Sequence, residues 1–189
     1  MRSILKIPYY YWKGLLSDSL CNAIIEDGLK LDNKKAEVNF GEKAHVDSKL
    51  REGTLGWFPE GGYVDKLLSS YVQEANMRAN WNFIITGKEQ PQFAGYKEGD
   101  FYDWHKDCSI ETSLYRKLSA TVQLSDPSYY KGGQFEIKTL WGQPLPMDKE
   151  TTERGTVIVF PSILDHRVTP IVKGTRYSIV QWYNGPDFV

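Results

Sequence analysis

The stretch Tyr96–Asp107, Y-K-E-G-D-F-Y-D-W-H-K-D, decides how this chain folds and what it can bind. It ends with His105 and Asp107 two residues apart, directly after a run rich in aromatic side chains. If that run is a β-strand, both side chains lie on one face, because side chains alternate along a strand. An imidazole beside a carboxylate is half of a metal site, so a third ligand has to come from elsewhere. A lone H-x-D pair is also common on ordinary surfaces, and the downstream sequence has to decide.

The third candidate ligand is His166, one of only three histidines in the chain. It follows Val157–Phe160, an apolar segment typical of a buried strand, and a short turn after Pro161 delivers it to the next strand. Ten residues later, Arg176 lies within the apolar run G-T-R-Y-S-I-V-Q-W. Burying an arginine there is costly unless it binds an anion, and its planar guanidinium suits a carboxylate. Ser178, on the same strand face, is a second donor to that carboxylate.

Two histidines and one carboxylate that leave coordination positions open are the facial triad of non-haem Fe(II) oxygenases. The open positions are needed because a co-substrate and dioxygen both bind the iron. A nearby arginine indicates that the co-substrate is an organic anion. The residues therefore predict an iron site at His105, Asp107 and His166, with Arg176 as the anion receptor.

The hydrophobic pattern predicts a helical beginning and a β-rich remainder. Residues 4–12 read as a strand broken at Pro8, and Ser17 or Asp18 caps a helix that runs to about Leu31 with Leu20, Ile24, Ile25 and Leu29 on its apolar face. Residues 32–56 read as a long polar loop, and a second helix spans Gly62–Arg78. Candidate strands follow at 81–86, 91–97, 101–106, 117–124, 133–138, 155–160, 166–171 and 175–183. This order predicts a mainly β fold, an antiparallel sandwich or barrel with helices packed outside. We expect a single domain, 1–189, with a helical part at about 1–80 and a β core at about 81–185.

Composition and charge argue against several functional classes. A formal net charge of -1 offers no basic surface for nucleic acid or an anionic membrane. Cys21 and Cys108 are the only cysteines, which implies no disulfide framework and a reducing compartment. No stretch approaches transmembrane length, and Lys6 and Pro8 interrupt the apolar run that a signal peptide needs. We expect a cytoplasmic protein.

In their order and spacing, these segments resemble the 2-oxoglutarate- and Fe(II)-dependent dioxygenases, in particular the prolyl 4-hydroxylase-like branch with its bacterial and viral PKHD-type hydroxylases. The resemblance covers about Gln92–Trp182 and is carried by Y-K-E-G-D-F-Y-D-W-H-K-D, K-L-S-A-T-V-Q-L-S-D-P-S-Y-Y-K-G-G-Q-F-E-I, G-T-V-I-V-F-P-S-I-L-D-H-R-V-T-P and G-T-R-Y-S-I-V-Q-W. It implies a double-stranded β-helix, a jelly-roll or cupin-like fold, with supporting N-terminal helices. It also implies Fe(II) held by His105, Asp107 and His166, with 2-oxoglutarate and O2 as co-substrates and ascorbate as an optional reductant.

The resemblance further assigns the residues that bind the co-substrate. Arg176 binds the distal carboxylate of 2-oxoglutarate, and Ser178 completes an R-x-S pair with it. Tyr96 matches a family tyrosine that reaches the co-substrate. Gln123 stands where several relatives have a tyrosine that points at the same carboxylate, so this chain departs from the family pattern there.

Three further residues are candidates for binding the prime substrate. The segment D-S-K-L-R-E-G-T-L-G-W-F-P resembles one that folds over the active site in prolyl hydroxylases. Arg51 then binds a substrate carbonyl or carboxylate and Trp57 walls the pocket; a surface arginine and a core tryptophan are the equal alternative. Tyr102 is the third candidate, because relatives have a tyrosine three residues before the first histidine.

The predicted function is hydroxylation of a prolyl residue in a peptide or protein, with release of succinate and CO2. The same chemistry on a free amino acid or another small metabolite stays open. Nucleic-acid demethylation is disfavoured, because those relatives usually carry a second arginine where this chain has Trp182. A non-catalytic β-helix that binds a metal or ligand is the alternative from another class, and the intact triad and Arg176 argue against it.

Overall fold

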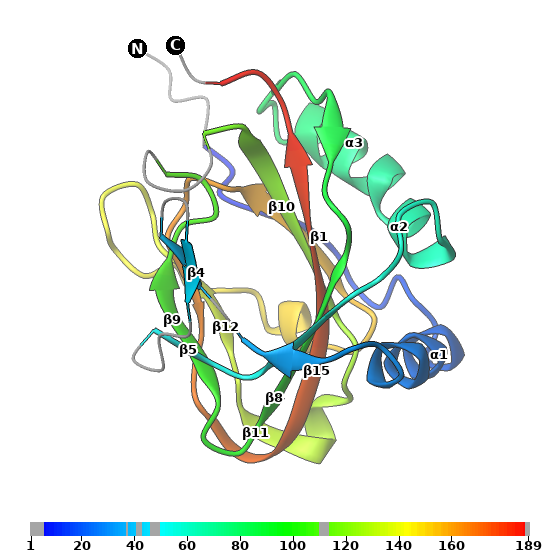
Figure 1. Ribbon diagram of the computed structural model, residues 1–189. Coiled ribbons are helices and arrows are strands. Elements are labelled where there is room, and N and C mark those ends of the chain that lie inside the picture. The colour runs from blue at the N-terminus through cyan, green and yellow to red at the C-terminus, as the bar shows by residue number, and fades with distance from the viewer. Residues whose placement is uncertain (1–5, 37, 41–42, 46–49, 110–113, 188–189) are drawn as a thin grey trace.

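Two antiparallel β-sheets face each other and enclose the space in which the candidate ligands lie (Figure 1). The structure, a computed structural model, describes residues 6–36, 38–40, 43–45, 50–109 and 114–187. The major sheet has nine strands: Tyr10–Trp12 (β1), Lys34–Lys35 (β2), Thr54–Trp57 (β6), Gly87–Lys88 (β7), Gln92–Lys97 (β8), Arg116–Gln123 (β10), Tyr130–Gly132 (β11), Val157–Pro161 (β13) and Ile171–Asn184 (β15). The minor sheet has four: Arg51–Glu52 (β5), Phe101–His105 (β9), Phe135–Ile137 (β12) and His166–Val168 (β14). Val38–Phe40 (β3) and Lys43–His45 (β4) form a separate hairpin.

The strand orders are those of a jelly roll. The major sheet runs β1-β13-β10-β15-β8-β6-β2, with β7 and β11 also paired to β15, and the minor sheet runs β12-β14-β9-β5. Neighbours in each sheet come from distant parts of the sequence, as in the pairing of β5 with β9 and of β6 with β8. This arrangement is the double-stranded β-helix that the resemblance implies.

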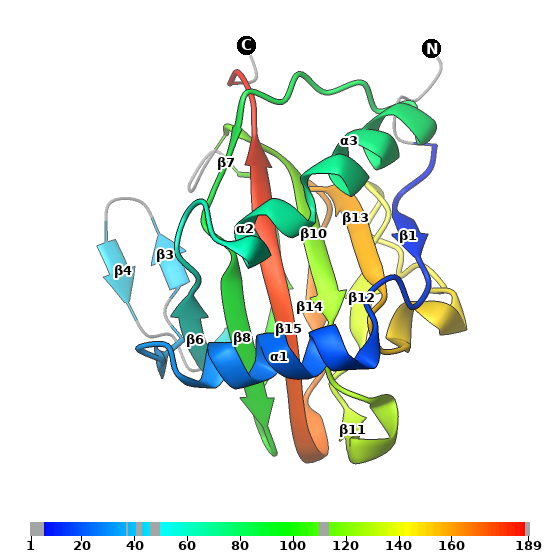
Figure 2. The same cartoon turned by 90° about the vertical axis from the view of Figure 1, so that its right-hand side faces the viewer.

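Three helices cover the outer face of the major sheet (Figure 2): Asp18–Leu29 (α1), Tyr63–Leu67 (α2) and Ser69–Arg78 (α3). Two 3-10 turns, Pro127–Tyr129 (η1) and Lys149–Thr152 (η2), lie in the connections. Ser17 caps α1 as predicted, its hydroxyl accepting a hydrogen bond from the backbone N–H of Leu20. None of the helices in the described ranges has the length and apolarity that a bilayer crossing requires.

The predicted apolar face of α1 is confirmed at Ile24, which is buried, and at Leu20 and Ile25, which pack against the core, but not at Leu29. Cys21, Ile24 and Gly28 are buried, whereas Leu29 is 55% exposed. The reason is contact with the sheet: a Cβ atom on Gly28 would lie 2.5 Å from the ring of Phe93, so only a glycine lets the helix approach this closely. The apolar periodicity of the helix does not indicate that a glycine lies on its buried face in close contact with the sheet.

The predicted helix over Gly62–Arg78 is interrupted at Leu68, so that α2 and α3 are separate. One apolar face nevertheless continues across the interruption, because Val64, Leu68, Val72 and Ala75 are all buried in the core between helices and sheet. Both short helices therefore contribute to the same core.

Side-chain alternation along the central strands separates the core beneath the helices from the space between the two sheets. On β10, Leu118, Ala120 and Val122 pack toward the helices, while Ser119, Thr121 and Gln123 are buried on the opposite face. The same alternation on β15 turns Ile179 and Tyr183 toward the helices, and Arg176, Ser178, Val180 and Trp182 toward the space between the sheets. The polar inner face of these strands therefore lines a site.

Several boundaries differ from the sequence predictions. Residues 32–56 are not one long loop, because they contribute β2, β5 and β6 to the two sheets and form the β3–β4 hairpin. Residues 81–86 form no strand, and Trp81 instead buries its indole beneath the N-terminal segment, donating to the carbonyl of Ile7 at 2.7 Å. The first strand is restricted to Tyr10–Trp12, with residues 4 and 5 outside the described ranges. Short polar segments become strands here because distant strands supply their hydrogen-bond partners.

Candidate metal centre and anion pocket

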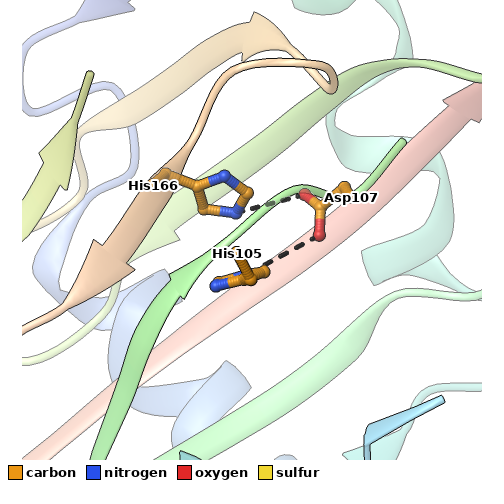
Figure 3. A group of neighbouring side chains, drawn as sticks. All are labelled: His105, Asp107 and His166. Atoms are coloured by element: carbon orange, nitrogen blue, oxygen red, sulfur yellow. Dashed lines mark ion pairs between the residues drawn. The ribbon is translucent and has the colours of Figure 1, made fainter. Parts of the chain in front are cut away.

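His105, Asp107 and His166 converge between the sheets, as the sequence predicts (Figure 3). His105 is the last residue of β9 and pairs in register with His166, the first residue of β14. Asp107 lies two residues past the strand, where its backbone N–H donates to the carbonyl of Ser162 at 3.1 Å. One ligand atom from each side chain lies within 4.8 Å of the others. Asp107 Oδ2 is 3.3 Å from His166 Nε2, and its Oδ1 is 3.8 Å from His105 Nε2.

Hydrogen bonds orient all three side chains. His105 Nδ1 lies 2.8 Å from the carbonyl oxygen of Asp103, and His166 Nδ1 lies 3.0 Å from that of Leu164. A carbonyl only accepts, so each Nδ1 carries the proton and each Nε2 presents its lone pair to the centre. The fully buried hydroxyl of Ser119 donates to Asp107 Oδ2 at 2.6 Å. Such contacts are the usual means of fixing metal ligands before a metal binds.

The three groups shift one another's protonation. Burial and the adjacent His166 hold the pKa of His105 well below its ordinary value, so this imidazole is neutral. Burial alone would raise the pKa of Asp107, but the two imidazoles outweigh it and lower that pKa far below the usual range. Burial also opposes the charged form of His166, yet the Asp107 carboxylate raises the pKa of His166 above its ordinary value. Asp107 is therefore an ionised ligand at neutral pH.

Arg176 is a buried cation with neutral neighbours. Its side chain is 1% exposed, its Nη2 donates to Gln123 Oε1 at 2.7 Å, and its Nη1 donates to Ser178 Oγ at 3.2 Å. The ring centroid of Tyr96 lies 6.0 Å from the guanidinium carbon. Among the residues that the structure describes, no acidic side chain pairs with it, and its Nε and the Nε2 of Gln123 have no hydrogen-bond partner. Buried donors without an acceptor in the chain call for an acceptor from outside it.

Comparison with known proteins shows the family. The model of the 2OG-Fe(II) oxygenase superfamily matches residues 91–184, the segment that holds the triad and Arg176. The chain belongs to this superfamily. A PKHD-type hydroxylase of Teredinibacter turnerae is 37% identical over 98 residues, and one of Pseudoalteromonas atlantica is 34% identical over 98 residues. Each match covers 49% of this chain and 41% of the relative, so the chain spans less than half the length of these relatives.

Solved structures confirm the predicted fold over nearly the whole chain. A Pseudomonas putida prolyl-4-hydroxylase has a TM-score of 0.72 at 20% identity, covering 96% of this chain and 95% of its own. A Trichoplax adhaerens prolyl hydroxylase, in complex with a peptide fragment of hypoxia inducible factor, has a TM-score of 0.73 at 19% identity, covering 95% of this chain and 84% of its own. The double-stranded β-helix of this superfamily member therefore includes the N-terminal segments that the family model does not match.

The triad and Arg176 line one cavity in this member of the superfamily. The lining residues share an inward orientation from the two sheets and are Arg51, Gln92, Tyr96, Tyr102, His105, Asp107, Thr121, Phe135, Phe160, His166, Val168, Arg176, Ser178, Val180 and Trp182. Of the residues predicted to bind co-substrate or substrate, Tyr96, Arg176, Ser178, Arg51 and Tyr102 are present in this set. Gln123 is absent from this set, and it contacts the lining through its hydrogen bond with Arg176.

Trp57 lies apart from the other predicted substrate residues. Its side chain is 46% exposed and is absent from the cavity lining; its ring centroid lies 6.2 Å from that of Trp182, which does line the cavity. It is neither a wall of the cavity nor a core tryptophan. Trp57 is the last residue of β6 and lies beyond the pairing with β2, which covers only Thr54 and Leu55, so it is exposed although Leu55 on the same strand face is buried.

Sequence reasoning missed several inward residues. Ser119 and Thr121 share a strand face with Gln123, and that spacing of two residues was a usable signal. Gln92 likewise shares a face with Tyr96 on β8. Nothing in the local sequence indicates that Phe135, from the minor sheet, packs 5.8 Å from His166 between ring centroids.

Proposed function

We propose that this chain is an Fe(II)- and 2-oxoglutarate-dependent dioxygenase that hydroxylates a prolyl residue of a peptide or protein, with release of succinate and CO2. The observation that carries the proposal is a single cavity holding both the His105–Asp107–His166 cluster and the unpaired guanidinium of Arg176. A metal site alone, or a buried arginine alone, would fit many proteins. Together they fit an iron centre served by an anionic co-substrate.

The donor set fits Fe(II). Two imidazole nitrogens and one carboxylate oxygen form the three-ligand set that leaves coordination positions open. The ligand atoms lie close enough to share one ion, and both imidazoles present Nε2 to the same point. We assign His105, Asp107 and His166 as the iron ligands.

The buried donors fit the distal carboxylate of 2-oxoglutarate. Arg176 Nε and Gln123 Nε2 are buried without acceptors, and a carboxylate would supply acceptors for both. Ser178 adds a hydroxyl beside the guanidinium. We propose that the Gln123 amide performs here the role of the tyrosine that several relatives have at this position. The Tyr96 hydroxyl accepts from Arg51 Nη2 at 3.0 Å, which leaves its own proton to donate to the co-substrate.

When bound, Fe(II), 2-oxoglutarate and O2 supply the oxidative chemistry. The chain contributes binding, orientation and exclusion of water. Arg176 sets the direction of the co-substrate, because a guanidinium grips a carboxylate in one plane. Phe135, Phe160 and Val180 form apolar walls, which strengthens the electrostatic contacts inside the cavity.

The choice of a prolyl substrate is supported by the PKHD-type relatives and by the prolyl hydroxylases that share the fold. We assign Tyr102 and Arg51 to the substrate side of the cavity, and Trp57, beside Trp182, to its rim. We also propose that residues 1–189 act as one domain, since β1 and β6 from the N-terminal part pair with β13 and β8 of the β core.

An anaerobic titration with Fe(II) and 2-oxoglutarate tests the cofactor assignment. Wild-type protein should develop the metal-to-ligand charge-transfer band, and His105→Ala and Arg176→Ala should weaken it. Arg78→Ala is the matched control, because Arg78 is an exposed arginine paired with Glu74 outside the cavity. Metal binding without any band in the wild type would sink the proposal and favour a binding protein. Succinate formation with proline peptides, and a gain of one oxygen atom in the peptide, then tests the substrate.

A further inference from the structure

Arg51 is a second buried cation in the cavity, and in the part of the chain that the structure describes no acidic side chain forms an ion pair with it. Its side chain is 5% exposed. Its Nη2 donates to Gln92 Oε1 at 3.1 Å and to the Tyr96 hydroxyl at 3.0 Å, and both acceptors are neutral. Its buried Nε has no partner, and none of the ion pairs among the described residues involves it. A buried guanidinium left in this state is costly unless an anion completes it.

The chain holds this guanidinium rigidly and close to the metal ligands. Arg51 comes from β5, its acceptors come from β8, and its guanidinium carbon lies 4.2 Å from the ring centroid of Tyr102 on β9. The Tyr102 ring also stacks on the imidazole of His105, at a centroid distance of 3.4 Å. One aromatic ring, that of Tyr102, therefore contacts both the Arg51 guanidinium and a metal-ligand imidazole.

Arg51 and Arg176 are separate receptors. Each guanidinium carbon lies 6.0 Å from the ring centroid of Tyr96, and the two side chains come from different sheets. Gln123 and Ser178 serve Arg176, whereas Gln92 and the Tyr96 hydroxyl serve Arg51. The cavity therefore contains two cationic positions, each with its own neutral acceptors.

Charge balance indicates what the second receptor binds. The charged side chains among the described lining residues are Arg51, Arg176 and Asp107, because the histidines bind a metal in their neutral form. A divalent ion and the 2-oxoglutarate dianion cancel each other. One positive charge of the lining then stays unbalanced, and a single substrate carboxylate would neutralise it.

We propose that Arg51 binds a carboxylate of the prime substrate, so that this enzyme acts on a substrate carrying an acidic group near the carbon that is hydroxylated. The inference rests on the iron and 2-oxoglutarate chemistry of the proposed function and specifies the substrate by its carboxylate. Two sources share this chemistry: the carboxylate of a free or N-blocked amino acid, and the C-terminal carboxylate of a peptide.

The test measures binding rather than turnover. Protein loaded with Zn(II), which has no redox chemistry, and with 2-oxoglutarate is titrated calorimetrically with N-acetyl-L-proline and with its amide, N-acetyl-L-prolinamide. A second pair is a short peptide ending in proline, as the free acid and as the C-terminal amide. In wild type and in the Arg78→Gln control, the acid of at least one pair should bind about tenfold to hundredfold tighter than its amide. Preference in the first pair identifies a small molecule, and preference only in the second identifies a peptide end.

Variants of Arg51 separate this inference from the proposed function. Arg51→Gln should abolish the preference for the acid and lower 2-oxoglutarate affinity far less than Arg176→Gln does, because Arg51 contacts the co-substrate site only through the Tyr96 hydroxyl. Arg51→Lys, which keeps the charge, should retain part of the preference. Thermal unfolding checks that both variants fold. Equal affinity for acid and amide in both wild-type pairs, including no binding of either, would overturn the inference. So would a loss of 2-oxoglutarate affinity in Arg51→Gln as large as that in Arg176→Gln. If wild-type protein fails to bind 2-oxoglutarate at all, the proposed function itself is wrong.

Discussion

Removing the hydroxyl of Ser119 should loosen the carboxylate ligand without changing any of the three ligands. Ser119 is fully buried, and its hydroxyl donates to Asp107 Oδ2 at 2.6 Å, a length typical of a bond to an ionised acceptor. Water cannot replace the lost donor in a site this enclosed, and alanine leaves almost no cavity. A hydrogen bond to a charged group contributes about 1.5–3 kcal/mol, so Ser119→Ala should lower the unfolding free energy of the metal-free protein by about 2 kcal/mol.

Ser119→Ala should lower the Zn(II) affinity more than the same substitution at the neighbouring Ser162. Loss of a contact that orients a ligand typically lowers metal affinity by about 10–100-fold. The assay is competition for Zn(II) against a chromophoric chelator, with urea unfolding of the metal-free protein in parallel. Ser162→Ala is the matched control, because the Ser162 hydroxyl lies 2.9 Å from that of Ser119 and its backbone carbonyl, which accepts from Asp107, is retained. Equal Zn(II) affinity in the two variants would refute the assignment of Ser119 as the group that positions Asp107.

Three further predictions follow from the packing and the protonation of the site. Gly28→Ala should destabilise the fold by about 1–3 kcal/mol in urea unfolding, because the new methyl group would lie 2.5 Å from the Phe93 ring; unchanged stability would contradict the close contact of α1 with the sheet. Gly133→Ala should weaken 2-oxoglutarate binding, measured calorimetrically, because its Cβ would lie 3.0 Å from Arg176 Cδ at a backbone φ of +61° that disfavours alanine; wild-type affinity would show that Arg176 tolerates displacement. Zn(II) affinity should fall about tenfold per pH unit below the raised pKa of His166 and level off above it, because a proton competes for its Nε2. A Zn(II) affinity that does not change with pH would contradict the raised pKa. In the metal-free protein, the raised pKa of His166 contributes stability that is complete below pH 6.5, its ordinary value, and that is lost as the pH rises through the raised pKa.

Much of the site could be predicted from the sequence because its parts are local patterns. The two-residue spacing of His105 and Asp107, the apolar strand before His166 and the R-x-S pair at Arg176 each depend only on alternation along a strand. Ligand chemistry then restricts such a set to few functions. The β-rich fold and the Ser17 cap of α1 were accessible for the same reason, since both depend on short-range spacing.

The tertiary structure alone decided where segments with weak local patterns lie. Residues 32–56 look like a loop because their strands are short and polar, and they become strands only by pairing with β8 and β9. That pairing buries Arg51 against Gln92, Tyr96 and Tyr102, which no spacing within its own segment indicates. The break at Leu68 was likewise not predictable from periodicity, because buried apolar residues continue on both sides of it.

The sequence thus determined which groups can hold a metal and an anion, because side-chain chemistry and strand alternation are local properties. Only the three-dimensional structure decided that two unpaired guanidinium groups share the cavity with the triad, and that Ser119 holds its carboxylate. The physical reason is that burial and the presence or absence of a partner depend on residues brought together from distant segments. The free energy of a buried charge, and therefore the ligand it requires, is set by that assembled environment.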